Sequence, residues 1–199
     1  MVYCNAHSRR HYEPIAKAAK QAGIASHMLS EYQRLYAIES EIKTTNIDRP
    51  KKGLPLLTPD EIKDIRQNKA KPILNNIKEY LDKKIMQAPP KSLIGVAMAY
   101  TIKYWSGLIK YLDDGRLSID NNHTERIIRK FVMARNNFLF ADTVEGAKAL
   151  CILFSLIQSA ILNGLEPYEY LVKVFKAIPY CKTVEDYIVL MPWNLKSPT

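Results

Sequence analysis

The sequence predicts a mainly α-helical protein, and three features support this prediction. Only 7 of the 199 residues are glycine, and apolar side chains recur at three- and four-residue spacing through most of the chain. Good helix-capping residues precede several of these stretches. The exceptions are two short apolar pieces, residues 1–4 and 138–140, where we expect a strand end or extended structure. A strand cannot stand alone, so partners for the first piece must come from elsewhere in the fold.

Two helices and a loop are expected in the first quarter of the chain. The first helix covers residues 9–22, with Pro14 in its first turn and Gly23 ending it. The second starts after the capping residue Ser26 and carries an apolar stripe as far as residue 42. Residues 44–57 contain two prolines and a glycine, which predicts a loop.

A strong helix start follows at Thr58-Pro59-Asp60-Glu61. Thr58 is a capping residue, Pro59 suits the first helical position, and Glu61 completes a capping box. This helix is expected to be disturbed at Pro72 and to end before the Pro89-Pro90 pair. Ser92 then opens another helix with a broad apolar face.

The last third of the chain predicts four more helices. The first runs to about Ala134, before a break at Asn136-Asn137. The second, residues 144–163, is the most hydrophobic helix of the chain, so we expect it to be buried as the core helix. It has Thr143 as its cap and Gly164 beyond its end, and the last two helices start at Pro167 and Thr183.

The charge of the chain favours a polyanionic partner. The formal net charge is +9, and the sequence pI is about 9.4. Nucleic acid is the first candidate, although many basic proteins bind none. The basic residues are spread along the chain, so charge alone does not locate a binding face.

The cysteines and the hydrophobic pattern predict a cytoplasmic protein. Three widely spaced cysteines argue against a disulfide framework and for a reducing compartment. The first residues run directly into polar and basic ones, so no signal peptide is expected. Residues 147–162 form the most apolar stretch, which is too short and too interrupted for us to expect a membrane span.

One stretch, residues 119–129, concentrates the polar chemistry of the chain. Asp120, Asn121 and Asn122 are good capping residues, and Glu125 falls in the first turn of the following helix. The positive end of the helix dipole favours an ionised glutamate at this position, which suits a metal-binding carboxylate. The alternative is an ordinary capped helix with Glu125, Arg126 and Arg129 on its solvated face.

A second candidate is the pair Cys4 and His7, two metal-ligand types three residues apart. A closed zinc site normally needs four such ligands in two close pairs, and the sequence shows no second pair. The alternative is that Cys4 is buried at a strand end while His7, Arg9 and Arg10 lie near an acidic or phosphate-bearing neighbour. No glycine-flanked serine or cysteine elbow and no glycine-rich phosphate loop is present.

Several segments of the chain, taken in order, carry a resemblance. Residues 4–10 read Cys-Asn-Ala-His-Ser-Arg-Arg, and residues 115–122 read Gly-Arg-Leu-Ser-Ile-Asp-Asn-Asn, followed by Glu125-Arg126 and Arg129. Further matching segments lie at 134–141, 163–171 and 190–194. Together these segments resemble bacterial insertion-sequence transposases of the sixty-six type. The Asp-Asn-Asn-x-x-Glu-Arg block is the most specific of them.

The resemblance implies a ribonuclease-H-like α/β core of the Asp-Asp-Glu class that acts on DNA with Mg²⁺ or Mn²⁺. By motif, Glu125 corresponds to the catalytic, metal-binding glutamate. Positions that match DNA-contacting or helix-supporting residues are Arg126, Arg129, Lys130 and Arg135. The remaining motif residues are Asp120, Asn121, Asn122, Cys4, His7, Arg9 and Arg10.

The resemblance also implies a domain organisation. Residues 1–10 would contain the last core strand and the Cys-x-x-His segment, and residues 11–115 would form a helical insertion. Residues 116–178 would hold the glutamate helix and the C-terminal core helices, and residues 179–199 a C-terminal tail segment. Because the two aspartates of the family lie upstream of the Cys-x-x-His segment, we expect a C-terminal portion of a transposase, truncated or frameshifted and inactive alone.

Three functional hypotheses follow from the sequence. The first is a transposase fragment whose Glu125 completes a two-metal site for cleavage and strand transfer at element ends and target DNA. The second is a non-catalytic basic helical module that binds DNA, self-associates or associates with full-length transposase. The third is an inert pseudogene remnant.

Overall fold

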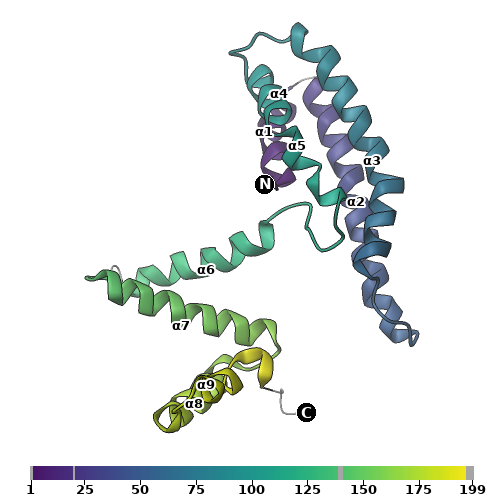
Figure 1. The fold of residues 1–199 in the computed structure, drawn as a ribbon. Helices are drawn as coiled ribbons and strands as arrows, with labels where there is room; N and C mark the ends of the chain where they lie inside the picture. Colours follow the sequence, from purple (N-terminus) through teal and green to yellow (C-terminus); the bar gives the residue numbers. More distant parts are fainter. Residues whose placement is uncertain (1, 20, 139–140, 196–199) are drawn as a thin grey trace. The chain divides into compact units, whose positions relative to one another are not determined.

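The structure, a computed structural model, describes residues 2–19, 21–138 and 141–195, with only the backbone described for residues 134, 135, 137 and 138. The part of the chain described is helical and contains no strand (Figure 1). It divides into two compact units, Met1–His123 and Thr124–Thr199. The prediction of a mainly α-helical protein is therefore confirmed, and an α/β core is not seen in this part of the chain.

The chain enters the first unit through an extended segment. Residues 2–4 form neither helix nor strand, so the predicted strand end is absent there. The Tyr3 amide instead donates a hydrogen bond to the Gly107 carbonyl at 3.0 Å. Helix α1 then covers Asn5–Ala18, four residues earlier than predicted, and Pro14 lies inside it. The early start arises because α1 buries Asn5, Ala6, Ser8 and Tyr12, a face that begins before residue 9.

Helix α2 covers Ile24–Lys51 and is much longer than predicted. Its first residue directly follows Gly23, so Ser26 lies within the helix and is not its cap. Most of the predicted loop at 44–57 is helical, since α2 continues through Pro50 in its last turn and ends at Lys51. The turn proper is at Gly53, whose φ of +72° a residue without Cβ adopts readily.

Helix α3 covers Pro59–Lys84, and its predicted start is confirmed in detail. The Thr58 hydroxyl accepts from the Glu61 amide at 3.2 Å, and the Glu61 carboxylate accepts from the Thr58 amide at 2.7 Å. Pro72 lies inside the helix without ending it. A 3₁₀ turn, η1 (Ile85–Gln87), follows before the two prolines.

Helix α4 (Leu93–Lys103) completes the packing around α1 and α2. Ser92 caps it as predicted, accepting from the Gly95 amide at 3.1 Å. Two short helices follow, α5 (Trp105–Leu108) and η2 (Lys110–Leu112). The main hydrophobic core lies among α1 to α4 and η2, and its largest fully buried side chains include Tyr12, Tyr32, Tyr111, Met28, Leu74 and Met98.

The second unit contains most of α6 (Asn122–Phe138), α7 (Val144–Leu162), α8 (Pro167–Ala177) and α9 (Val184–Val189), with 3₁₀ turns η3 (Ile178–Tyr180) and η4 (Pro192–Asn194). The predicted cap Thr143 is confirmed by its side-chain bond, the last helix starts at Thr183 as predicted with Thr183 as its cap, and Gly164 has a φ of +74°. The predicted break at Asn136-Asn137 is wrong, because α6 continues to Phe138. Residues 139 and 140 of the predicted apolar strand lie outside the described part of the chain.

The prediction that the most hydrophobic helix would be the core helix is wrong for this structure. Only Gln158 and Ala160 of α7 are buried, and a small cluster of Ala160, Leu165, Tyr170 and Val174 forms the core of the second unit. An apolar composition indicates that a helix tends to be buried. Whether it is buried depends on which other elements pack against it. By length and composition α7 is the one described helix that could cross a membrane, a test that core helices of soluble proteins also pass.

Candidate functional site

The candidate site begins where residues 119–122 lead into α6. The Asp120 carboxylate accepts hydrogen bonds from the Asn122 amide at 3.1 Å and from the Asn122 side chain at 2.7 Å. These local bonds satisfy donors at the start of the helix that no helical carbonyl can reach. Asp120 lies two residues before α6, and its carboxylate is engaged with the first residue of the helix. Asn121 is exposed.

Helix α1 contributes the second set of contacts to this start. The Asn5 side chain, which is 1% exposed, donates to the Leu108 carbonyl at 2.9 Å and to the Ile119 carbonyl at 3.2 Å. The Asn5 backbone amide also donates to Ile119 at 3.1 Å. Arg10, farther along α1, donates to the Asn122 side chain at 3.2 Å. The first turns of α1 therefore hold the backbone just before α6.

Helix α2 supplies a third contact through Tyr36. The Tyr36 hydroxyl donates to the Asp120 carboxylate at 2.9 Å. Burial and this carboxylate both raise the pKa of Tyr36 well above its ordinary value, so the phenol stays protonated and remains a donor. The Arg9 guanidinium lies over the Tyr36 ring, 5.7 Å from its centroid. Asp120, Arg9 and Arg10 thus take part in positioning the start of α6.

Cys4 and His7, weighed above as a possible metal pair, lie together at the start of α1. Both are half-buried, and one potential ligand atom of each lies within 4.8 Å of the other. Cys4 occupies the cap position of α1 without a side-chain capping bond. Within the described residues, neither unit taken by itself gathers three side chains able to hold a metal ion. Two ligands do not close a structural zinc site.

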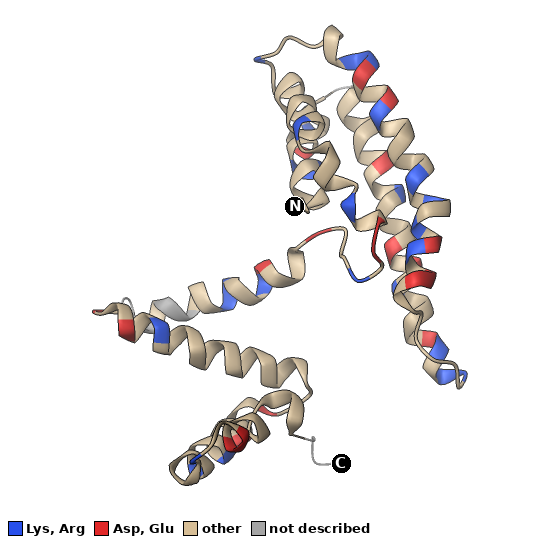
Figure 2. Ribbon diagram, in the orientation of Figure 1, with Lys and Arg blue, Asp and Glu red and all other residues tan. Residues whose placement is uncertain are grey.

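Glu125 lies in the first turn of α6, one turn after the anchored Asn122, and is half-buried. Arg126, Arg129 and Lys130 follow it in α6 and are exposed. Their spacing of three and four residues places them on one side of the helix. Figure 2 shows basic positions along α6. Phe131 is half-buried and contacts Phe154 of α7, with ring centroids 5.0 Å apart. Arg135 lies in the same helix, but its side chain is outside the described part of the structure.

Of the carboxylates in this region, only that of Glu125 is suited to bind Mg²⁺ or Mn²⁺, and it would supply one ligand. Carboxylate oxygens suit these hard cations, and Glu125 sits near the positive end of a helix dipole. Asp120 is a poor additional ligand, because its two oxygens already accept from Tyr36 and Asn122. A two-metal site needs more carboxylates than this region offers.

Three residues outside the candidate set bond the segment before α6: Asn5 at Ile119, Tyr36 at Asp120, and Arg66 at the Leu117 carbonyl, the last at 2.8 Å. Ser8, also outside that set, anchors α1 in the core. The Ser8 hydroxyl accepts from Tyr32 at 2.7 Å and shares a 2.8 Å bond with Thr101, inside the core. Helical spacing along the sequence does indicate some of these residues, because they share a helix face with buried apolar residues. Asn5 and Ser8 share the face of α1 that buries Tyr12, and Arg66 shares the face of α3 that buries Ala70 and Ile73.

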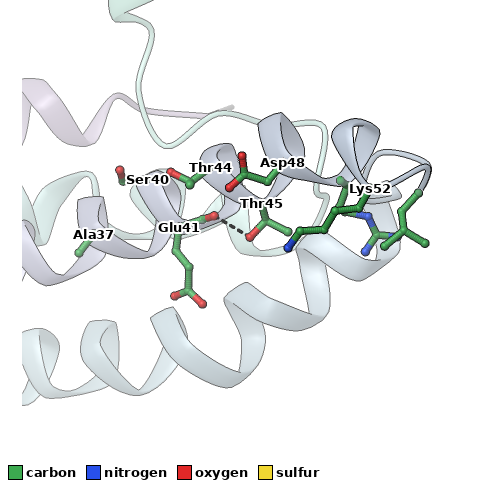
Figure 3. Close-up of a pocket in the computed structure, with 9 residues that line it drawn as sticks. Ala37, Ser40, Glu41, Thr44, Thr45, Asp48 and Lys52 are labelled. Carbon is green, nitrogen blue, oxygen red and sulfur yellow. Dashed lines mark hydrogen bonds between the residues drawn. The ribbon is translucent and has the colours of Figure 1, made fainter.

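A groove of about 500 Å³ lies along α2 near the Gly53 turn, away from this region of the chain (Figure 3). Three of its charged side chains, those of Glu41, Asp48 and Arg49, have partners in the structure. Glu41 pairs with Lys69 at 2.6 Å, Asp48 pairs with Lys51 at 2.9 Å, and Arg49 donates to the Pro55 carbonyl at 2.6 Å. Both carboxylates that line the groove are therefore already paired with lysines.

Comparison with known families gives two adjacent matches that cover most of the chain. The model described as "Transposase IS66 family" matches residues 1–149. The model described as "IS66 C-terminal element" matches residues 155–193.

Three proteins of Sinorhizobium fredii (strain NBRC 101917 / NGR234) are similar in sequence, and all three are described as uncharacterized. Protein y4jD is 29% identical over 99% of this chain and 36% of its own length. Protein y4hP is 28% identical over 98% of this chain and 35% of its own length, and y4qI is 31% identical over 67% and 25%. The chain thus spans about a third of the length of the first two relatives. No solved structure matches.

Proposed function

Because the chain belongs to the IS66 family of transposases, we propose that it supplies the catalytic glutamate of a DNA-transposing enzyme. The observation that carries this proposal is the anchored start of α6. Hydrogen bonds that involve Asp120, Asn5 and Arg10 hold Ile119 and Asn122 in place at this start. Glu125 follows within one turn of α6. A metal ligand held on a rigid element is placed more precisely than one on a loop.

The proposed reaction is phosphodiester cleavage followed by strand transfer. Water attacks phosphorus at the element end, and the bond to the 3′ oxygen breaks, which leaves a 3′-hydroxyl. That hydroxyl then attacks a phosphodiester of target DNA, and the displaced oxygen of the target strand leaves. Mg²⁺ or Mn²⁺, when bound, activates the nucleophile and stabilises the leaving oxygen.

The chain's own part in this reaction is narrow. Glu125 would be one metal ligand, and upstream aspartates of the longer enzyme would supply the others. Arg126, Arg129 and Lys130 form a basic strip that would neutralise DNA phosphates near the reacting bond. We propose that the ribonuclease-H-like α/β core is completed by the part of the enzyme that the longer relatives have and this chain does not cover.

The test is Glu125→Gln in the transposase polypeptide that carries this chain, measured as Mn²⁺-dependent nicking of labelled element-end DNA. We expect at least about a 100-fold slower cleavage, since a metal ligand contributes several kcal/mol to transition-state stabilisation. Glu145→Gln is the matched control, because Glu145 also lies in the first turn of a helix and is exposed. Equal loss in both variants would contradict the assignment, as would cleavage by the 199-residue chain alone.

DNA affinity measured in the same experiment separates this function from a non-catalytic DNA-binding module. The exposed basic strip of α6 favours that second candidate. For the catalytic role, Glu125→Gln leaves binding intact and weakens cleavage. For a binding module, affinity falls with rising salt for both proteins and no cleavage occurs under any metal condition.

A further inference from the structure

A single buried arginine of α3 contacts the backbone that leads to α6. The side chain of Arg66 is 4% exposed. Its Nη1 donates to the carbonyls of Tyr111 at 3.0 Å, Asp114 at 3.3 Å and Leu117 at 2.8 Å. The last two belong to residues 113–121, the segment between η2 and α6 that we call the connector.

Arg66 is itself fixed from the opposite side by α2. Its Nε and Nη2 donate to the two carboxylate oxygens of Glu39, both at 2.8 Å. The guanidinium also lies over the Tyr111 ring, 5.2 Å from the centroid. This planar, two-sided arrangement uses the fork of an arginine, which the single ammonium of a lysine cannot reproduce.

Two further contacts join α3 to the connector and to Leu112, the residue just before it. Gln67 donates to the Leu112 carbonyl at 3.0 Å. A Cβ added to Gly115 would lie 2.0 Å from the Pro59 carbonyl oxygen, so the connector backbone packs directly on the first turn of α3. Two parts of α3 therefore set the path of the connector: the face that carries Arg66, and the first turn of the helix.

We propose that Arg66 is a positioning residue for Glu125. It holds the connector against α3, so that Ile119 reaches Asn5 and Asp120 reaches Tyr36, and these contacts set where α6 begins. The consequence for Glu125 rests on the proposed function. The consequence for the connector does not, because it concerns contacts within the first unit only.

The first test uses Arg66→Lys in the 199-residue chain, with amide hydrogen exchange followed by NMR. The Leu117 amide bonds to Asp114 and the Asn122 amide to Asp120, so both report on the connector. We expect exchange at both to rise by on the order of tenfold, while exchange at Leu35 in the core changes less than about twofold. Lys69→Met, on the same helix but paired with Glu41, is the control and should leave all three unchanged.

Gly115→Ala provides an independent variant should Arg66→Lys fail to fold. It lifts the connector from α3 without touching Arg66, and the same two amides should lose protection. Uniform loss of protection across the chain in the folded variants would show that Arg66 is only a core residue. Unchanged exchange at Leu117 and Asn122 would overturn the proposal directly.

The second test separates this proposal from the proposed function. In the transposase that carries this chain, Arg66→Lys should slow metal-dependent cleavage about tenfold or more, measured at a temperature where the variant is still fully folded, while DNA affinity stays unchanged. If Arg66→Lys loosens the connector but Glu125→Gln cleaves normally, the positioning of the connector stands and the catalytic role of Glu125 fails. If Glu125→Gln is inactive but Arg66→Lys cleaves normally, Arg66 does not position Glu125.

Discussion

At the scale of single residues, Asp120 shows how a motif residue can act without contacting a substrate. A conspicuous aspartate before a glutamate helix invites assignment as a metal ligand. In the structure both of its oxygens instead accept hydrogen bonds. The donors are Asn122, the first residue of α6, and Tyr36 of α2. Charged acceptors form the stronger hydrogen bonds in proteins, so this carboxylate is suited to linking two elements.

Asp120→Ala should lower the free energy of unfolding by about 1–3 kcal/mol, because the half-buried Tyr36 hydroxyl loses its acceptor. Urea unfolding measures this change. In the Tyr36→Phe background the same substitution should cost less, since the orphaned hydroxyl is gone. Asp113→Ala, at an exposed aspartate of the same segment, is the control and should change stability by less than about 0.5 kcal/mol. Equal costs for Asp120→Ala in both backgrounds would contradict a direct link to Tyr36.

At the scale of elements, the helix starts that depend on local chemistry formed where the sequence indicates. Thr58, Ser92, Thr143 and Thr183 each accept from a backbone amide three residues ahead. Such caps act within one turn and need no distant partner, so a single sequence reveals them. Helix α1 starts differently, because its first residues are held by the carbonyls of Leu108 and Ile119.

Thr58→Ala should destabilise the protein by about 1 kcal/mol, because it removes one half of the capping box of α3. The other half should persist, since the Thr58 backbone amide still donates to Glu61 and keeps the pKa of that carboxyl lowered. Thermal unfolding measures the loss. Thr44→Ala, at an exposed position within α2, should be neutral or slightly stabilising because alanine has the higher helix propensity. A neutral Thr58→Ala would show that packing alone fixes the start of α3.

At the scale of the whole molecule, buried phenols distinguish the first unit. Tyr12, Tyr32 and Tyr111 are each at most 1% exposed, and all lie in the main core. Burial raises the pKa of Tyr32 to about 12, and it raises the pKa of Tyr12 and Tyr111 as well. In the folded protein these hydroxyls therefore stay neutral at a pH where exposed phenols ionise.

We expect the first unit to unfold cooperatively in alkali. A pKa raised above the unfolded value of about 10 stabilises the folded state fully below that pH, and this stability is lost as pH rises toward 12 and beyond. Tyrosinate absorbance and circular dichroism, followed from pH 8 to 13, should show ionisation of the buried phenols coinciding with loss of helix. Ionisation of every tyrosine with the helices intact would contradict their burial.

The sequence by itself determined the helical class, most helix starts and the block around Glu125. Helical periodicity and capping act over a few residues, and the motif residues are readable in order along the chain. The ends of these helices were predicted less well than their starts. Residues 44–57 read as a loop and Asn136-Asn137 as a break, but α2 extends to Lys51 and α6 to Phe138. The propensities of single residues only weakly determine where a helix ends.

Only the tertiary structure decided how the start of α6 is held. Asn5, Tyr36 and Arg66 lie 115, 84 and 54 residues from Asp120 along the sequence, and no local pattern joins them to it. Their polar groups bond because burial leaves each donor without water, so it must find an acceptor on another element. Tertiary packing likewise decided that the main core would form around α1 to α4 and not around α7, since burial depends on the partners that a helix finds.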